Sequence, residues 1–252
     1  MFKTERQEEI LNILKQFNYA TVEYLAQQMH MSPSSIRRDL RALEAIKIVK
    51  RSYGGVTLLQ SENVLTPFQL RIHEHNKEKK SIAKAAARLV KEGDTVFIDG
   101  SSSALNMIEF LRPDYHNIVF TNNLKSALML VELGIETYCI GGLISAKNGV
   151  VSVGHYAEEM IKNIYVDIMF FSSSAISLEG NITDVCESET SLRREMLKHS
   201  KCKVFLCDES RMGKISIFQV CNIDKIDYVI SNRPFREEFL KEHEEVSFIV
   251  ND

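Results

Sequence analysis

The sequence predicts an α/β protein in which a small helical domain precedes a larger domain of alternating helices and strands. Two observations indicate this. Up to about residue 57, apolar residues recur with the 3.6-residue period of amphipathic helices. From residue 77 onward, short and nearly all-apolar segments alternate with helical ones, which is typical of a largely parallel sheet. We therefore expect a helical domain over residues 1–57, a linker over 58–76 and an α/β domain over 77–252.

The composition is that of an ordinary globular chain, but its charge is unevenly distributed. The 252 residues are 44% hydrophobic and 26% charged, with a formal net charge of -3. Of the 31 Lys and Arg and 34 Asp and Glu, Met1–Thr57 holds 9 and 6, which leaves 22 and 28 for the rest. The first part is basic and the remainder acidic. This asymmetry favours a nucleic-acid contact near the N-terminus.

The cysteines and the apolar segments indicate the cellular compartment. The 5 cysteines form no CxxC pair and no zinc-ligand spacing with histidine, so we expect reduced thiols and no metal site. The N-terminus has no apolar signal core, and no apolar run approaches the ~18 residues of a membrane helix. We expect a cytoplasmic protein without a membrane contact or a cofactor.

The first part of the chain predicts three helices. The first is apolar on one face, where Ile10 and Leu14 recur at helical spacing. Thr21 is an N-cap for the second helix. Ser32 is an N-cap for the third, and Pro33 suits its first position because proline has no N–H to lose there. The short gap between the second and third helices is typical of a helix-turn-helix.

The third helix contains the stretch SPSSIRRDL, in which two arginines are followed at once by an acid. At ~100° per residue, its residues separate onto different faces. The apolar stripe consists of Ile36, Leu40 and Leu43. The side turned away from that stripe carries Arg37, Arg38 and Arg41. Asp39 falls beyond the edge of the arginine arc, where it can pair with a neighbouring basic side chain or cap instead of facing a phosphate.

The segment KIVKRSYGGV follows, and its β-prone residues and Gly54-Gly55 turn predict a hairpin, the wing of a winged helix. Arginine can fork onto guanine edges, and serine hydroxyls can contact phosphate or base. The candidate DNA contacts are Thr21, Ser32, Ser34, Ser35, Ile36, Arg37, Arg38, Arg41, Lys50 and Arg51. The alternative is a solvated charged face. The tight turn, the cap and the wing favour DNA binding.

The α/β domain is predicted from its apolar runs. The expected strands lie in TVFIDG, NIVFTNN, TYCIGG, DIMFFSSSA, KVFLCD and YVISN. The expected helices lie in SIAKAAARLVKEG, SALNMIEFL, LKSALMLVELG and ETSLRREMLKHS. Ligands of such sheets sit at the carboxyl ends of the strands. Here those ends carry hydroxyls, amides and glycines, which suit a polar, anionic small molecule.

The candidate ligand residues follow these strand ends. Glycine lets the backbone approach a ligand, and amides at a helix start favour an anion such as phosphate. The set is Asp99, Gly100, Ser101, Ser102, Ser103, Thr121, Asn122, Asn123, Gly141, Gly142, Ser174, Asp184, Glu187, Arg211 and Lys214. Asp184, Glu187 and the nearby Glu189 suit sugar hydroxyls or proton transfer. Arg211 and Lys214 suit phosphate. The alternatives are ordinary βα turns and loop surface.

On the basis of these motifs, the chain resembles the DeoR family of bacterial transcriptional regulators along nearly its whole length. SPSSIRRDLRALE matches the family's specific helix-turn-helix pattern S-x-x-[ST]-I-R-R-D-L-x-x-L-E, and VKRSYGGV is similar to its wing. PFQLRIHEHNKEKKSIAKAAARLVKEGDTVFIDGSSSA, FTNN, IGG, DIMFFSSSAIS, GNITD and CDESRMGK follow in the family order. The sequence departs from the pattern at Lys47, Tyr53 and Arg211, where glycine, histidine and lysine are common.

The resemblance implies a repressor whose sensor domain is similar to sugar-phosphate isomerases but is not catalytic. It implies a phosphorylated sugar as inducer, a ligand loop at Asp99–Ser103, and a crevice lined also by Asn122, Gly141, Gly142 and Asp184. Because one recognition helix reads one half-site, we expect a dimer or tetramer on operator DNA. The alternative is an enzyme, a sugar-phosphate isomerase or aminosugar-phosphate deaminase with Asp184 or Glu187 as base.

Overall fold

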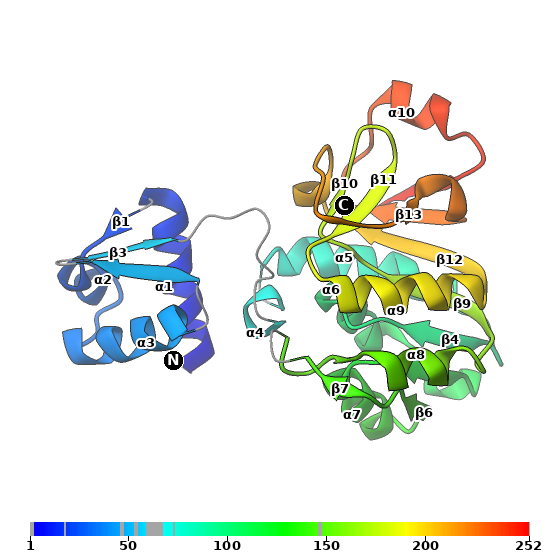
Figure 1. The fold of residues 1–252 in the computed structure, drawn as a ribbon, viewed down its shortest axis with the longest axis horizontal. Coiled ribbons are helices and arrows are strands. Elements are labelled where there is room, and N and C mark those ends of the chain that lie inside the picture. The colour runs from blue at the N-terminus through cyan, green and yellow to red at the C-terminus, as the bar shows by residue number, and fades with distance from the viewer. Residues whose placement is uncertain are drawn as a thin grey trace. The chain divides into compact units, whose positions relative to one another are not determined.

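The computed structural model describes residues 3–17, 19–45, 48–52, 55–58, 68–72, 74–145 and 148–251. The chain divides into two compact units, Met1–Glu74 and His75–Asp252 (Figure 1). Lys47, Tyr53 and residues 59–67 of the expected linker lie outside the described residues. Within that linker, Phe68–Arg71 forms a short helix, α4.

The first unit has the predicted helix-turn-helix and hairpin. Its helices are α1 (Lys3–Phe17), α2 (Val22–Gln28) and α3 (Pro33–Ala45). Its strands are β1 (Tyr19–Ala20), β2 (Val49–Ser52) and β3 (Gly55–Leu58), in the antiparallel order β1-β3-β2. The register of the wing pairs Ser52 of β2 with Gly55 of β3. The two predicted caps also form: the Thr21 hydroxyl accepts from the Tyr24 N–H at 3.1 Å, and the Ser32 hydroxyl from the Ser35 N–H at 3.2 Å.

A buried ion pair fixes α3 against α1. Asp39 is fully buried, and the Arg6 guanidinium donates to its two oxygens at 2.8 and 3.1 Å. Beside it the core of the unit contains Leu14 of α1, Leu25 of α2 and Leu40 of α3. The expectation that the acid in SPSSIRRDL pairs with a basic side chain is confirmed. The pair orients α3, so its arginines point away from the core.

The second unit is built on a seven-stranded, fully parallel sheet in the order β15-β14-β12-β9-β4-β5-β6. Its strands are β4 (Thr95–Ile98), β5 (Ile118–Thr121), β6 (Glu136–Cys139), β9 (Val166–Phe171), β12 (Ser200–Cys207), β14 (Tyr228–Ser231) and β15 (Ser247–Val250). Six were predicted. The edge strand β15 was not, because its four residues follow a charged run.

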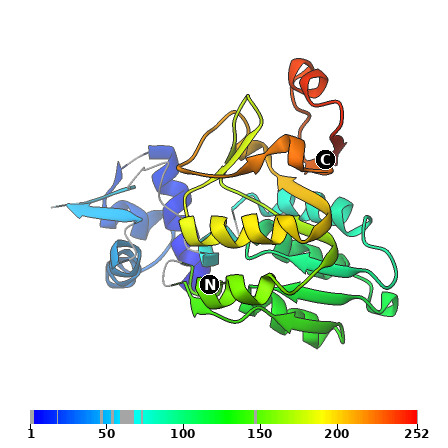
Figure 2. The same cartoon turned by 45° about the vertical axis from the view of Figure 1, so that its right-hand side comes forward.

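Helices cover this sheet. They are α5 (Asn76–Ala87), α6 (Ser102–Leu105), α7 (Leu124–Glu132), α8 (His155–Ile161), α9 (Glu187–Lys198) and α10 (Glu237–Glu242). The segment expected as one helix, SALNMIEFL, divides into α6 and a 3₁₀ helix, Asn106–Phe110. Helices α8 and α9 lie side by side (Figures 1 and 2). No helix among the described residues is long and apolar enough to cross a membrane.

Two smaller sheets flank the large one. Strands β10 (Ala175–Ile176), β11 (Asn181–Asp184) and β13 (Phe218–Asn222) form an antiparallel sheet. Strands β7 (Leu143–Ile144) and β8 (Ser152–Val153) form a hairpin. The end of this hairpin crosses the carboxyl end of β5, because the Ser152 N–H donates to the Asn122 carbonyl at 2.8 Å and the Leu124 N–H to the Val150 carbonyl at 2.9 Å.

Candidate functional site

The outer face of α3 is a candidate nucleic-acid interface. Arg37, Arg38 and Arg41 are all exposed there, on the side opposite the buried stripe. The Arg37 guanidinium lies 3.3 Å from the Glu23 carboxylate of α2. Within the described part of the chain, Arg38 and Arg41 form no hydrogen bond or ion pair. These two side chains are therefore the ones free to reach a duplex.

The remaining DNA candidates divide by position. Lys50 on β2 is exposed, as is Ser34 on α3. Arg51 is held by Glu44 of α3, which accepts from its Nε at 2.6 Å and from its backbone N–H at 3.1 Å. Ile36 requires a correction. Its side chain is fully buried in the core of the first unit, so it anchors α3 and cannot contact DNA.

In the second unit, four charged side chains meet at the carboxyl edge of the large sheet. Arg193 of α9 donates from Nε to Asp99 at 2.8 Å, from Nη1 to Asp184 at 2.9 Å and from Nη2 to Glu189 at 3.3 Å. All four side chains are at most 5% exposed. Two predicted residues, Asp99 after β4 and Asp184 at the end of β11, are thus brought together. We call these four residues the Arg193 cluster.

The electrostatics of the Arg193 cluster favour a permanent positive charge at its centre. Burial acts to lower the pKa of Arg193, but the carboxylates of Asp99, Asp184 and Glu189 outweigh it and raise that pKa. Three acids around one cation leave the cluster with a formal excess of negative charge. Carboxylate oxygens with spare lone pairs accept hydrogen bonds from hydroxyl groups. The cluster therefore suits the hydroxyls of a ligand better than its anionic group.

A second ion pair lies next along the same edge. Asp208 follows β12, is buried, and accepts from the Arg211 Nε at 2.7 Å. Arg211 also donates to the Ser173 carbonyl. Burial acts to raise the pKa of Asp208, but the Arg211 charge and hydrogen bonds from Ser210 and Arg211 lower it to about 2. Arg211 is already bound to protein acceptors, so a ligand phosphate would have to compete with Asp208 for it.

The lowered pKa of Asp208 predicts a pH-dependent contribution to stability. Since the folded pKa of about 2 lies below the ordinary aspartate value of 3.8, the contribution is present above about pH 4 and is lost as pH falls toward 2. We expect Asp208→Asn to lower the free energy of unfolding by roughly 2 kcal/mol at pH 7. Urea titrations at pH 7 and pH 3 should show this difference shrinking at the lower pH. A difference that is constant with pH would contradict the ionic origin.

The part of the edge around Asn122 is incompletely hydrogen-bonded. The Asn122 side-chain nitrogen donates to the Ser152 carbonyl at 3.0 Å, but its Oδ1 has no partner. Other buried hydroxyls among the described residues also have none: Ser103, Ser126, Ser152 and Thr190. An unsatisfied buried polar group costs about 1–3 kcal/mol. The unpartnered atoms of Ser103, which follows β4, and of Asn122 and Ser126, which follow β5, indicate a place for bound water or for a ligand.

Gly100 is required between the end of β4 and the crossing β7–β8 segment. A Cβ at this position would lie 2.8 Å from both methyl carbons of Val151, which is fully buried. We expect Gly100→Ala to destabilise the chain by about 1–3 kcal/mol through overpacking. Gly141 is the matched control, because a Cβ there meets nothing within 4 Å. In urea unfolding followed by circular dichroism, equal midpoints for the two variants would contradict the close approach.

Several predicted residues have local structural roles or lie outside the cluster. Ser101 caps α6 and Asn123 caps α7. Ser174 donates to Asp184 at 3.1 Å, and the Ser102 hydroxyl accepts from the buried Lys79 at 3.1 Å. The exposed members of the predicted set are Gly141, Gly142, Glu187 and Lys214.

The sequence did not predict Arg193, Lys79, Asp208 or Asn148 as site residues. Asn148 donates to Glu189 at 2.7 Å and so connects the β7–β8 hairpin to the Arg193 cluster. The available signal was the Glu189–Arg193 spacing of four residues, which places both side chains on one face of α9.

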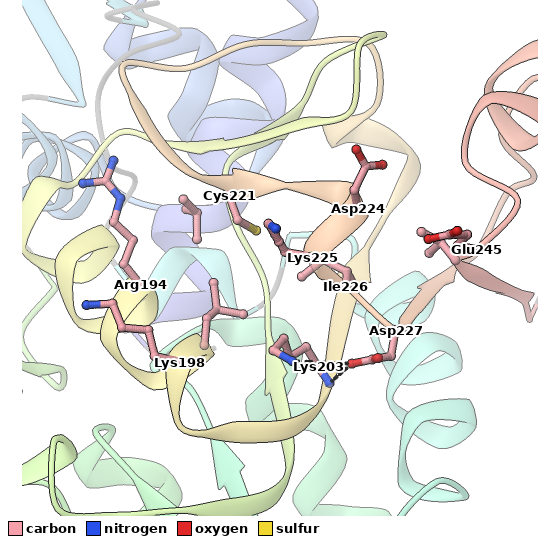
Figure 3. Close-up of a pocket in the computed structure, with 12 residues that line it drawn as sticks. Arg194, Lys198, Lys203, Cys221, Asp224, Lys225, Ile226, Asp227 and Glu245 are labelled. Atoms are coloured by element: carbon pink, nitrogen blue, oxygen red, sulfur yellow. Dashed lines mark hydrogen bonds and ion pairs between the residues drawn. The ribbon is translucent and has the colours of Figure 1, made fainter.

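A cleft of about 620 Å³ lies elsewhere in the second unit and is not lined by the residues of the Arg193 cluster (Figure 3). Arg194 and Lys198 come from α9, while Lys203 faces Asp227 at 4.0 Å. Charges of both signs line it, together with apolar side chains such as Ile226. No predicted ligand residue lines this cleft, and no lining residue has a buried polar side-chain atom without a partner. The carboxyl edge remains the better candidate site.

Comparison with known proteins agrees with both units. The DeoR-like helix-turn-helix domain matches residues 6–62 and the DeoR C terminal sensor domain matches residues 74–233. The HTH-type transcriptional regulator GolR of Listeria innocua is 34% identical over 99% of this chain and 98% of its own length. The L-fucose operon activator of Haemophilus influenzae is 31% identical over 94% of each chain.

The chain also has more distant similarities. The glycerol-3-phosphate regulon repressor of Escherichia coli is 26% identical over 93% of this chain and 92% of its own length. Among solved structures, ribose 5-phosphate isomerase A of Methanocaldococcus jannaschii aligns with 16% identity and a TM-score of 0.40 over 55% of each chain. The family matches favour a regulator over the isomerase or deaminase alternative. The chain belongs to the DeoR family of transcriptional regulators.

Proposed function

We propose that this regulator is a cytoplasmic repressor that binds operator DNA through α3 and the wing and is released by a phosphorylated carbohydrate. The observation that carries the proposal is a combination of two features. Arginines without partners are exposed on α3, and the second unit contains a buried site whose polar atoms lack hydrogen-bond partners. Arg38 and Arg41 supply the DNA-facing charge. The Arg193 cluster and the nearby buried polar groups without hydrogen-bond partners supply a candidate ligand site in the second unit.

The two ends of this site favour two different parts of one ligand. Hydroxyls suit the carboxylates of Asp99 and Asp184, which carry excess negative charge. A phosphate is repelled there and better suits the other end, where the Ser103 and Ser126 hydroxyls have no partner and the buried Lys79 lies 3.1 Å from the Ser102 hydroxyl. The relatives named for glycerol 3-phosphate and L-fucose support a carbohydrate ligand. One of these is a repressor and the other an activator, so the direction of control is part of the proposal.

Ligand and DNA would be coupled by linkage. A ligand that binds the DNA-incompetent arrangement more tightly shifts the population toward it, and DNA must weaken ligand binding by the same factor. A coupling of 1–3 kcal/mol corresponds to roughly 5- to 150-fold in DNA affinity. This reciprocity is itself measurable.

The test combines two titrations on the full chain. Fluorescence anisotropy measures binding to a duplex from the gene's own upstream region, with and without each member of a panel of sugar phosphates. Thermal shift measures ligand binding directly, since a ligand of the folded state raises the melting temperature. The unphosphorylated sugars are the matched controls. We expect one sugar phosphate to raise the melting temperature and to lower DNA affinity.

Three outcomes would overturn parts of the proposal. A duplex affinity no greater than that for unrelated DNA would remove the operator function. A ligand that tightens DNA binding would make the protein an activator. Turnover of a sugar phosphate by the pure protein would revive the enzyme alternative.

A further inference from the structure

Helix α7 is apolar on its outward face as well as on its buried one. Leu124, Leu128 and Val131 recur at spacings of four and three residues and are 38%, 67% and 61% exposed. Leu130 and Ser126 are buried on the opposite side. A surface helix of a monomer ordinarily presents polar residues to water. An exposed stripe with this spacing is the pattern of a helix that packs against another helix.

The elements next to α7 extend this apolar surface. Helix α7 packs on β6, the last strand of the large sheet, whose outer edge has no partner strand in the described part of the chain. Tyr138 on β6 is 45% exposed, and Leu143 and Ile144 on β7 are also exposed. Figure 1 shows α7, β6 and β7 at the same end of the second unit. We call the surface formed by Leu124, Leu128, Val131, Leu133, Tyr138, Leu143 and Ile144 the α7 face.

The charged side chains beside the stripe are complementary to the same side chains on a second copy of α7. Lys125 and Glu132 lie seven residues apart, and at ~100° per residue they fall within about 20° of one another on the same flank of the stripe. One is near the start of α7 and the other is its last residue. Neither side chain makes an ion pair or hydrogen bond with any described residue. If two copies of α7 pack antiparallel, Lys125 of one copy meets Glu132 of the partner subunit, and this happens twice.

We propose that the α7 face is the interface of a two-fold homodimer, with the two α7 helices packed antiparallel. A two-fold axis makes every contact between unlike positions occur twice, which is the arrangement that Lys125 and Glu132 require. An unrelated partner would need a matching pattern of its own, whereas a second copy has it already. The inference deepens the proposed function, because a two-fold operator requires two α3 helices in one assembly.

The main test is the mass of the full chain in solution, by gel filtration with light scattering over a range of concentrations. We expect a dimer for the unmodified chain. Leu128→Glu should raise the dissociation constant by at least about 10-fold, because it puts two charges into an apolar contact. Ile215→Glu is the matched control, since Ile215 is also 67% exposed but lies on the loop before β13. It should leave the mass unchanged.

Charge exchange tests the antiparallel arrangement itself. Lys125→Glu and Glu132→Lys should each weaken the dimer, since each places like charges together at two points. The double variant should restore dimerisation, because the pairs re-form with their signs exchanged. Circular dichroism establishes that every variant is folded. A monomeric unmodified chain, a Leu128→Glu variant with an unchanged dissociation constant or a double variant no better than the singles would each overturn the proposal.

Failure of this inference is distinguishable from failure of the proposed function. If Leu128→Glu stays dimeric and binds operator normally, the α7 face is not the interface but the regulator remains. If the unmodified dimer binds no DNA, the operator proposal fails while the interface stands.

Discussion

Replacing both Arg38 and Arg41 by alanine is expected to lower operator affinity by about 100-fold or more. Each side chain is exposed on α3 and has no partner among the described residues. A bidentate contact from arginine to a base contributes about 1–3 kcal/mol of discrimination. Fluorescence anisotropy with the operator duplex and with an unrelated duplex measures the loss. Base reading predicts a greater loss for the operator than for unrelated DNA.

Single substitutions at Arg37 and Lys50 provide the comparison for the operator affinity of this double variant. Arg37→Ala should cost less, because the Arg37 guanidinium already lies against Glu23 at 3.3 Å. Lys50→Ala should weaken both duplexes alike and reduce the salt dependence by about one unit, as expected for a phosphate contact. Operator affinity unchanged in the Arg38 and Arg41 double variant would exclude α3 as the reading helix.

The geometry of the first unit could be predicted from sequence because helical periodicity separates its faces. The position of Asp39 beyond the arginine arc followed from the same angles. Its partner did not, because Arg6 lies 33 residues away on α1 and only tertiary packing brings them together. The assignment of Ile36 to the DNA surface was wrong, because Ile36 belongs to the apolar stripe of α3. The same helix position cannot both anchor the core and face the groove.

The residues that lie at the carboxyl edge of the large sheet were predictable only in part. Asp99 and the residues after β5 were found because apolar strands of a parallel sheet end at a common edge. Arg193 was not found, since it is followed by Arg194 in a charged helix, a pattern that is usually a solvated face. The crossing of the β7–β8 segment over Gly100 was also not predictable. Short strands such as β7 and β8 leave little periodicity to read.

Arg193→Ala is expected to produce the largest loss of stability, about 3–5 kcal/mol or more. The substitution leaves Asp99, Asp184 and Glu189 buried without their common cation. Removing one partner of a buried ion pair costs this much because the remaining charge keeps its desolvation penalty. Here three carboxylates would repel one another as well. Since the chain contains no tryptophan, urea unfolding followed by circular dichroism measures the effect.

Arg194→Ala is the matched control for this prediction. Arg194 is the next residue of α9, is exposed, and donates to the Gln219 carbonyl. Its loss removes one cation from the same helix but leaves no buried charge, so we expect a change of about 1 kcal/mol or less. Arg193→Lys should fall between the two, because lysine restores the charge but cannot donate to three carboxylates in one plane. If Arg193→Ala and Arg194→Ala destabilise the chain equally, the Arg193 cluster does not organise the carboxyl edge, and the ligand site proposed there loses its foundation.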